Sequence, residues 1–229
     1  MSEQPKTDVR EDGVTRRQFV KGLGAVSATA VFGGTILGGL LFPNGVMAIP
    51  ASTGYLLVDM KKCQGCNTCM MACSLAHHGE QNLSLSRIQI VQDSWKGYPD
   101  DIGIEACRQC KDPKCVEACP TGAMHADADT GEVRLVDADK CIGCMQCVEA
   151  CPHGSGRVIW NHEEGHAQKC DLCANTPFWD HKGGPGGTQA CISVCPVNAI
   201  KYTDTLPGDD GYEVNLRGKG WAAIGLSTD

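Results

Sequence analysis

Sixteen cysteines in four groups of four constrain this 229-residue chain more than any other feature of its sequence. In the first and third groups, gaps of two, two and three residues separate successive cysteines. The second group has gaps of two, four and three residues, and the fourth has gaps of two, seventeen and three. The groups use every cysteine of the chain: Cys63, Cys66, Cys69 and Cys73; Cys107, Cys110, Cys115 and Cys119; Cys141, Cys144, Cys147 and Cys151; Cys170, Cys173, Cys191 and Cys195.

The spacing of the first and third groups matches the cysteine run that holds [4Fe-4S] clusters in bacterial ferredoxins. Two-residue gaps let three thiolates converge on one cluster, and the fourth cysteine, one helical turn further on, faces a neighbouring cluster. A proline, which ends a short helix, follows the last cysteine of the second, third and fourth groups. We therefore predict that all sixteen cysteines are iron ligands and that the chain holds four [4Fe-4S] clusters.

Disulfides and zinc are the alternative uses of so many cysteines. Zinc sites take paired Cys-x2-Cys or Cys/His motifs, not three thiols within seven residues plus a fourth. Eight disulfides require partners at suitable Cα separations, and they give no reason for the repeated Cys-Pro endings. Among cluster types, a [3Fe-4S] cluster at one of the four sites is the alternative to four cubanes.

An internal repeat indicates the fold class. Residues 115–120 recur letter for letter as residues 147–152, and residues 191–196 repeat their pattern. We predict an α+β fold of duplicated, bacterial-ferredoxin-like dicluster units, each too small to bury a core without its clusters. The expected strands cover residues 55–60, 87–92, 132–137, 157–160 and 199–203, and the expected short helices cover residues 67–78, 113–119, 145–151 and 190–195.

The N-terminus carries an export pattern. Arg16 and Arg17 form a twin-arginine motif, an apolar run covers residues 22–42, and small residues end at Ala48. We predict a twin-arginine signal at residues 1–48, a four-cluster domain at 49–203 and a polar C-terminal tail at 204–229. This organisation places the protein in the periplasm, and an uncleaved signal that anchors it to the membrane is the alternative.

Charge and motifs exclude several function classes. A net charge of −7 and an isoelectric point near 5.5 differ from the basic stripe of a nucleic-acid-binding protein. The sequence has no nucleophile–base arrangement and no phosphate-binding loop, so we predict no catalytic residue in this chain. The expected function is electron transfer.

Beyond these local patterns, residues 54–203 resemble the four-cluster electron-transfer subunits of molybdenum or tungsten bis-pterin oxidoreductases. Residues 63–66, 83–88, 107–110 and 169–173 are similar to the subunits paired with tungsten aldehyde oxidoreductase-like enzymes. Formate dehydrogenases and thiosulfate, polysulfide or dimethyl sulfoxide reductases share the same cysteine order. The resemblance implies a large bis-pterin catalytic partner and, for a membrane-linked complex, a quinone-reactive or cytochrome subunit. A free-standing exported polyferredoxin that shuttles electrons among several partners is the alternative.

The resemblance also implies which cysteines share a cluster. The outer pair of clusters uses groups 63–73 and 170–195, and the inner pair uses groups 107–119 and 141–151. The implied ligand sets are Cys63, Cys66, Cys69 and Cys195; Cys170, Cys173, Cys191 and Cys73; Cys107, Cys110, Cys115 and Cys151; and Cys141, Cys144, Cys147 and Cys119.

Three histidines lie near these motifs. Ser74 replaces the proline found after the other groups, so the first helix is free to continue to His77 and His78. We expect those two histidines at a solvated helix end, with contact to a quinone or haem partner as the alternative. His153 is expected in a partly exposed loop, with a hydrogen bond to a cluster sulfur as the alternative. Residues 84–86 and the long loop 175–189 are candidate docking surfaces.

Overall fold

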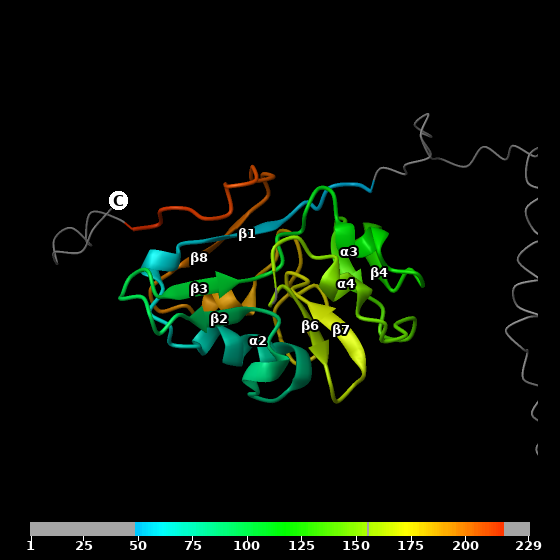
Figure 1. The fold of residues 1–229 in the computed structure, drawn as a ribbon, viewed down its shortest axis with the longest axis horizontal. Helices are drawn as coiled ribbons and strands as arrows, with labels where there is room; N and C mark the ends of the chain where they lie inside the picture. The colour runs from blue at the N-terminus through cyan, green and yellow to red at the C-terminus, as the bar shows by residue number, and fades with distance from the viewer. Residues whose placement is uncertain (1–48, 155, 218–229) are drawn as a thin grey trace, which may run out of the picture. The chain divides into compact units, whose positions relative to one another are not determined.

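Short antiparallel hairpins, single-turn helices and one helix of 11 residues make up the described part of the protein (Figure 1). The computed structural model describes residues 49–154 and 156–217. The predicted export signal at residues 1–48 and residues 218–229 of the predicted tail lie outside the described residues. The mixture of strands and helices agrees with the predicted α+β class.

Eight strands of the described chain pair into four separate two-stranded antiparallel sheets. One sheet joins the two ends of the described chain, because Tyr55 lies opposite Thr203. The other three sheets are hairpins between neighbouring strands. The pairs are β1 (Tyr55–Val58) with β8 (Ile200–Thr203), β2 (Gln89–Gln92) with β3 (Ile102–Glu105), β4 (Met124–Asp127) with β5 (Val133–Val136), and β6 (Val158–Asn161) with β7 (His166–Lys169).

Within residues 49–154 and 156–217, four α-helices and three 3₁₀ turns connect the strands. They are η1 (Met60–Lys62), α2 (Thr68–His78), η2 (Leu83–Leu85), α3 (Lys114–Glu117), η3 (Ala128–Thr130), α4 (Gln146–Glu149) and α5 (Ala190–Ser193). Gly79 ends α2 in the left-handed conformation (φ 73°) and donates its N–H to the carbonyl of Leu75. No helix within residues 49–154 and 156–217 combines the length and apolar character needed to cross a membrane.

The predicted elements agree closely with these bounds. Each of the five expected strands and four expected helices is present within a few residues of its predicted limits. Helix α2 continues past Ser74 to His78, as the missing proline predicted. The sequence analysis missed β3, β4 and β7, whose residues include glycine, histidine, lysine and aspartate rather than a run of β-branched side chains.

Cysteine side chains form much of the core. The largest buried cluster joins aliphatic residues of β1, β3, β5 and β8 to six cysteine side chains: Cys63, Cys69, Cys73, Cys107, Cys170 and Cys191. A second cluster surrounds Met124, Cys147 and Val158. Among the Phe, Trp and Tyr residues of the described chain, only Tyr55 and Tyr212 are buried. The packing of this protein therefore depends on what its thiols bind.

Residues after β8 return to β1 and pack against it. Val58 accepts the N–H of Val214 at 2.8 Å and donates its own N–H to Tyr212 at 2.9 Å. Arg217 lies 3.3 Å from the buried carboxylate of Asp59. The sequence analysis predicted a polar C-terminal tail at residues 204–229. Up to residue 217, this segment packs against the domain, because Tyr212 and the Asp59–Arg217 pair are buried there.

Candidate iron–sulfur cluster sites

The first Cys-x2-Cys turn of each group repeats one backbone conformation. The residue before the second cysteine is left-handed in all four turns: Gly65, Gln109, Gly143 and Leu172, with φ between 50° and 72°. A second left-handed residue lies three positions after the last cysteine of groups two to four: Gly122, Gly154 and Asn198. These kinks turn backbone N–H groups toward sulfur. For example, Ala199 donates to the Sγ of Cys195 at 3.2 Å, and Met124 donates to that of Cys119 at 3.3 Å.

Site A comprises Cys63, Cys66, Cys69 and Cys195, which line one cavity of about 330 Å³ together with side chains from β2, β3 and β8. Burial raises the pKa of the Cys69 thiol to about 12, and the neighbouring thiols of Cys63 and Cys195 add to the effect. Cys66 is exposed, and a hydrogen bond from the Thr68 hydroxyl lowers its pKa. Site A therefore has one edge at the surface.

Site B comprises Cys73, Cys170, Cys173 and Cys191, all of them buried. Burial raises the pKa of Cys191 well above its ordinary value, and the thiols of Cys173, Cys170 and Cys73 raise it further. The thiol of Cys69 in site A also raises the pKa of Cys191, and the thiol of Cys107 raises the pKa of Cys170. Site B therefore lies between site A and the site that contains Cys107.

Site C comprises Cys107, Cys110, Cys115 and Cys151, which line a cavity of about 360 Å³. Burial raises the pKa of Cys115 to about 12 and that of Cys110 to about 11. The N–H of Gln109 points at the Sγ of Cys107 at 3.4 Å.

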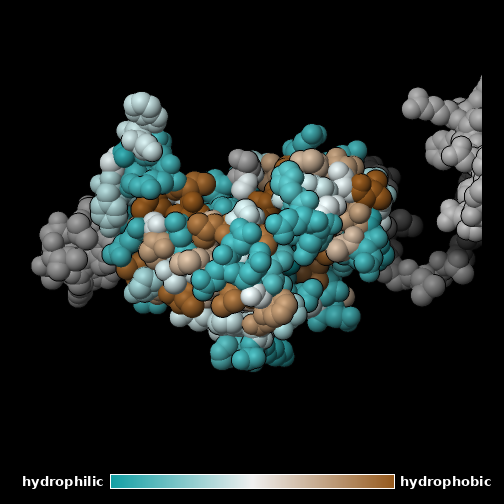
Figure 2. All heavy atoms as spheres, turned by 90° about the horizontal axis from the view of Figure 1, so that it is seen from below, coloured by the Kyte–Doolittle hydropathy of each residue, from teal (hydrophilic) through white to brown (hydrophobic). Residues whose placement is uncertain are grey.

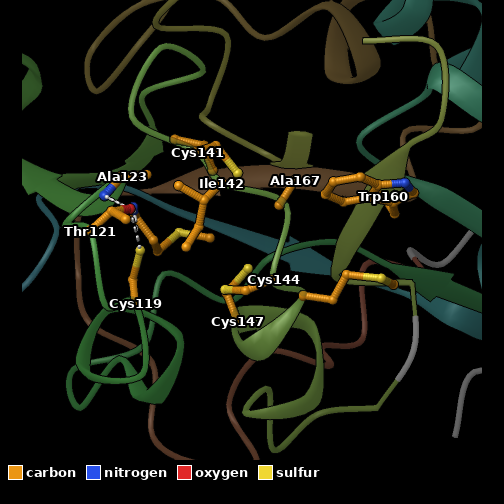
Figure 3. Close-up of a pocket in the computed structure, with 12 residues that line it drawn as sticks. Cys119, Thr121, Ala123, Cys141, Ile142, Cys144, Cys147, Trp160 and Ala167 are labelled. Atoms are coloured by element: carbon orange, nitrogen blue, oxygen red, sulfur yellow. Dashed lines mark hydrogen bonds between the residues drawn. The ribbon is translucent and has the colours of Figure 1, made fainter. Parts of the chain in front are cut away.

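Site D comprises Cys119, Cys141, Cys144 and Cys147, which line a cavity of about 350 Å³ (Figure 3). In Figure 3 their side chains approach a common space between the loop that carries Cys119 and the loop that carries Cys141. Cys144 is exposed, and Ile142 and Met145 beside it are 67% and 40% exposed. Site D, like site A, has an edge at the surface.

Each helical segment carries two cysteines, one for each of two neighbouring sites. Helix α2 carries Cys69 and Cys73, and the α5 segment carries Cys191 and Cys195, so these two packed segments join sites A and B. The α3 and α4 segments pack together and join sites C and D in the same way. The four sites therefore follow one another in the order A, B, C, D.

The donor chemistry of the sites fits [4Fe-4S] clusters. Three cavities of nearly equal volume each meet four thiols. Without a cation, burial keeps thiols such as Cys69, Cys115 and Cys173 protonated, because it raises each pKa to about 12; bound iron instead stabilises thiolates. In residues 49–154 and 156–217, no three His, Cys, Asp or Glu side chains converge closely enough to hold a single metal ion.

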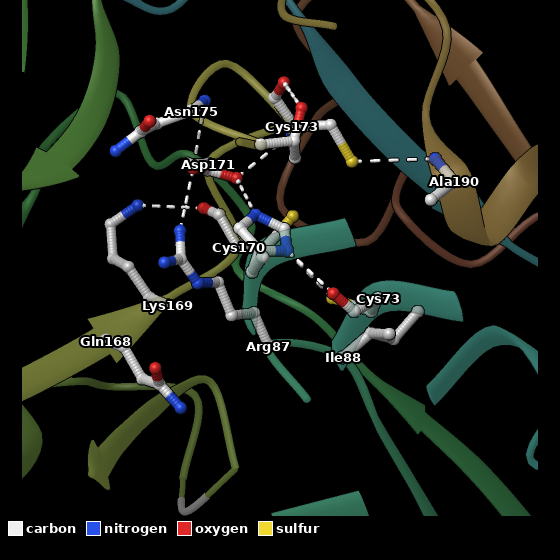
Figure 4. Close-up of polar contacts among 12 residues, drawn as sticks. Cys73, Arg87, Ile88, Gln168, Lys169, Cys170, Asp171, Cys173, Asn175 and Ala190 are labelled. Atoms are coloured by element: carbon white, nitrogen blue, oxygen red, sulfur yellow. Dashed lines mark hydrogen bonds and ion pairs between the residues drawn. The ribbon is translucent and has the colours of Figure 1, made fainter. Parts of the chain in front are cut away.

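His77 is buried at site B, and the expectation of a solvated helix end is wrong for this residue (Figure 4). Its Nε2 lies 2.9 Å from Asp171 and its Nδ1 lies 2.8 Å from the Cys73 carbonyl oxygen. Nδ1 is also 3.7 Å from the Sγ of Cys73. Burial alone would lower the pKa of His77, but the hydrogen bonds to the Asp171 carboxylate and the Cys73 thiol raise it to about 9. Arg87 donates to the other oxygen of Asp171 at 2.7 Å. The missed partner, Asp171, is what draws the end of α2 inward.

Asp171 connects this network to the ligand loop of site B. Burial would raise the pKa of Asp171, but the hydrogen bond from His77 and the charge of Arg87 lower it to about 2. Its oxygens also accept the N–H groups of Cys173 at 3.0 Å and Asn175 at 3.3 Å. His78, by contrast, keeps partial exposure and lies 3.7 Å from Glu164.

His153 lies in a partly exposed loop, as expected, and it also reaches a predicted ligand. Its Nε2 is 3.2 Å from the Sγ of Cys110, and its carbonyl accepts a hydrogen bond from Arg157. Burial and the charges of Arg108 and Arg157 lower the pKa of His153, which favours a neutral ring. With its proton on Nε2, the ring donates to the sulfur.

Replacing His153 by leucine tests this contact. Hydrogen bonds to cluster sulfurs raise the reduction potential, because they stabilise the added negative charge. We expect His153→Leu to lower one of the cluster potentials by on the order of 1 kcal/mol per electron, with the iron content unchanged. A redox titration followed by electron paramagnetic resonance measures this, and four unchanged potentials would contradict it.

The long loop between Cys173 and Cys191 packs directly on site B. A Cβ at Gly183 would collide with the carbonyl of Cys173 and lie 2.8 Å from its Cβ. Gly184 donates its N–H to the carbonyl of Leu172 at 2.8 Å, and Gln189 donates to the carbonyl of Gly184 at 3.0 Å. A backbone hydrogen bond from Gly184 thus holds the loop against the cysteine turn, and the Gln189 side chain fixes the conformation of the loop.

We expect Gly183→Ala to destabilise the protein by roughly 1–3 kcal/mol, because the added methyl group has backbone on its near side and cannot be accommodated by a side-chain shift. Gly97→Ala is the matched control, since nothing lies within 4 Å of its Cβ position. The denaturant concentration at which the visible absorbance is lost reports the difference. Equal midpoints for the two variants would contradict the close packing.

Two family models match the chain. Residues 101–205 match a model described as a 4Fe-4S dicluster domain, and residues 60–76 match a 4Fe-4S binding domain. The chain is 33% identical over 194 residues to the protein NrfC of Escherichia coli (strain K12), an alignment that covers 82% of this chain and 79% of NrfC. This chain belongs to the 4Fe-4S dicluster ferredoxin family. It is an iron–sulfur electron-transfer protein.

Two further relatives are named as parts of oxidoreductases. A probable anaerobic dimethyl sulfoxide reductase chain, YnfG of Escherichia coli (strain K12), is 33% identical over 157 residues, which cover 63% of this chain and 70% of YnfG. The beta subunit of an NADH-dependent phenylglyoxylate dehydrogenase from Aromatoleum evansii is 36% identical over 148 residues. That alignment covers 64% of this chain but only 29% of the dehydrogenase subunit.

Proposed function

We propose that the thiols of sites A, B, C and D are the ligands of four [4Fe-4S] clusters in two duplicated dicluster units. The observation that carries this proposal is the set of three near-equal cavities, each met by four thiols from two distant cysteine groups. When bound, each cluster supplies one-electron transfer.

The protein residues define a path and shield site B, within that path, from water. Sites B and C lie between sites A and D, and all four thiols of site B are buried. Cys66 of site A and Cys144 of site D are the two exposed ligands at the ends. Around Cys144, Ile142 and Met145 form an apolar rim that a partner protein can cover. Apolar side chains also reach the face drawn in Figure 2 in separate patches between polar ones.

The redox partner in this proposal is a molybdenum or tungsten bis-pterin oxidoreductase subunit, and this chain connects it to a second partner. The order of the four cysteine groups and the relatives named as oxidoreductase chains support this proposal. The twin-arginine pattern at Arg16 and Arg17 also supports it, because this pattern is typical of exported proteins that fold around a cofactor. The sequence similarity to tungsten aldehyde oxidoreductase-like systems favours tungsten. Export places the complex in the periplasm.

Anaerobic purification of the native protein from periplasm and membranes tests the partner. We expect about sixteen irons per chain together with a large co-eluting subunit and tungsten. Molybdenum instead of tungsten would move the assignment toward the reductases and formate dehydrogenases. A fully loaded chain with no co-eluting subunit would contradict the fixed complex and support a free-standing polyferredoxin.

A further inference from the structure

Two buried cations in this protein have no carboxylate partner. The side chains of Asp59, His77, Arg134, Lys169 and Asp171 are all buried. Asp59 pairs with Arg217, and Asp171 pairs with both His77 and Arg87. Arg134 and Lys169, which are 1% and 2% exposed, form no ion pair with any carboxylate among residues 49–154 and 156–217.

Both cations belong to one hydrogen-bonded network between sites B and C. The Arg134 guanidinium donates to the Cys110 carbonyl at 2.9 Å, and Lys169 donates to the carbonyls of Cys170, at 3.0 Å, and Arg134. Gln109 links Arg134 to Cys170. Its side-chain amide donates to the Cys170 carbonyl and accepts a hydrogen bond from the backbone N–H of Arg134, each at 2.8 Å. Figure 4 shows the Lys169 side chain directed at Cys170.

The network leaves positive charge uncompensated. The Nε of Arg134 is buried without a hydrogen-bond partner. Glu132 and Asp171 face the two cations but lie beyond ion-pair distance, and Asp171 is already paired twice. A buried charge without a partner is strongly destabilising, so a negative group that completes the pairs is required.

The thiols of sites B and C supply the place for that negative group. Arg134 lines the cavity of site C together with Cys107 and Cys115, and the charge of Lys169 acts on Cys115. An iron–sulfur cluster held by four thiolates is anionic, and its negative charge grows when it accepts an electron. In the described chain, no lysine or arginine lines the cavity of site A or that of site D.

We propose that Arg134 and Lys169 are the counter-charges of sites B and C, and that they give these sites higher reduction potentials than sites A and D. An electron on the path is then held in the buried middle and leaves it through the exposed ends. This inference rests on the ligand assignment of the proposed function.

Lys140 provides a matched control within the same chain. Lys140 directly precedes Cys141 of site D, as Lys169 directly precedes Cys170 of site B. The side chain of Lys140 is 62% exposed and pairs with Asp137 at 2.7 Å. Lys140→Met and Lys169→Met therefore remove the same charge at equivalent positions, one solvated and one buried.

The test is a redox titration with dithionite, followed by electron paramagnetic resonance, on anaerobically purified full-length protein. In Lys169→Met and Arg134→Met we expect at least a tenfold fall in the reduced-to-oxidised ratio of one or two clusters at fixed potential, which is about 59 mV for one electron. Lys169→Arg is expected to restore the ratio, and Lys140→Met is expected to leave all four clusters unchanged.

Iron analysis separates this inference from the proposed function. A wild-type chain without about sixteen irons would overturn the ligand assignment itself. A loaded wild type with unchanged potentials in loaded Lys169→Met and Arg134→Met would overturn only the counter-charge role. If either methionine variant does not take up iron, Lys169→Gln and Arg134→Lys test the counter-charge role instead. Lys169→Gln removes the charge and must lower a cluster potential, whereas Arg134→Lys keeps the charge and must not.

Discussion

Replacing Cys191 by serine is expected to prevent the accumulation of folded, iron-loaded protein. Cys191 lies in the largest buried cluster, next to Cys69, Cys73 and Cys170, so a lost cluster at site B removes the centre of the core. The serine hydroxyl would be buried among apolar and sulfur atoms, where an unsatisfied polar group costs about 1–3 kcal/mol in addition. The yield of brown soluble protein and its iron content measure the effect.

Cys144→Ser is the matched comparison. Cys144 makes the same kind of contribution to site D, but it is exposed at the edge of the protein. We expect this variant to fold and to lose at most about one iron, as in a change from [4Fe-4S] to [3Fe-4S]. Similar yields for the two serine variants would contradict the central position of site B in the core.

Asp171→Asn is expected to lower the free energy of unfolding by roughly 3–5 kcal/mol, because it leaves one buried and one partly buried cationic partner without their counter-charge. The carboxylate contacts His77 at 2.9 Å and Arg87 at 2.7 Å, and it also accepts two N–H groups of the site B loop. Asparagine keeps the shape of the side chain but not its charge. The shift in the denaturant midpoint of the loaded protein measures the loss.

Asp137→Asn is the control for Asp171→Asn. Asp137 pairs with Lys140 at 2.7 Å on the surface, where solvent screens the charges and the pair contributes little to stability. We expect no measurable change in its midpoint. Equal midpoints for Asp137→Asn and Asp171→Asn would mean that the buried network does not stabilise the fold.

The sequence predicted the parts of this fold that depend on cysteine spacing. The first two-residue gap of each group forms a turn with a left-handed residue before the second cysteine, and a four-residue step along a helix carries its two cysteines to different sites. Both features are local, so the four turns and four short helices follow from the pattern alone. The ligand sets themselves came from a resemblance, and they stay a prediction that the arrangement of the thiols supports.

The features that the sequence analysis missed depend on contacts between distant residues. His77 looked like a solvated helix end because its partner Asp171 lies 94 residues further along the chain. Arg134 and Lys169 look like ordinary surface cations in the sequence, and their burial follows only from how the hairpins β4–β5 and β6–β7 pack around the thiols. Strand β7 carries a lysine inward for the same reason.

Native mass spectrometry of the anaerobically purified full-length chain is the sharpest test that the sixteen cysteines hold four [4Fe-4S] clusters, because it counts iron and inorganic sulfide on one molecule. Four cubane clusters predict a mass increase of about sixteen irons and sixteen sulfides per chain. A chain that carries zinc instead, or one whose mass is lower by the hydrogens lost in disulfide formation, would contradict the assignment of its sixteen cysteines.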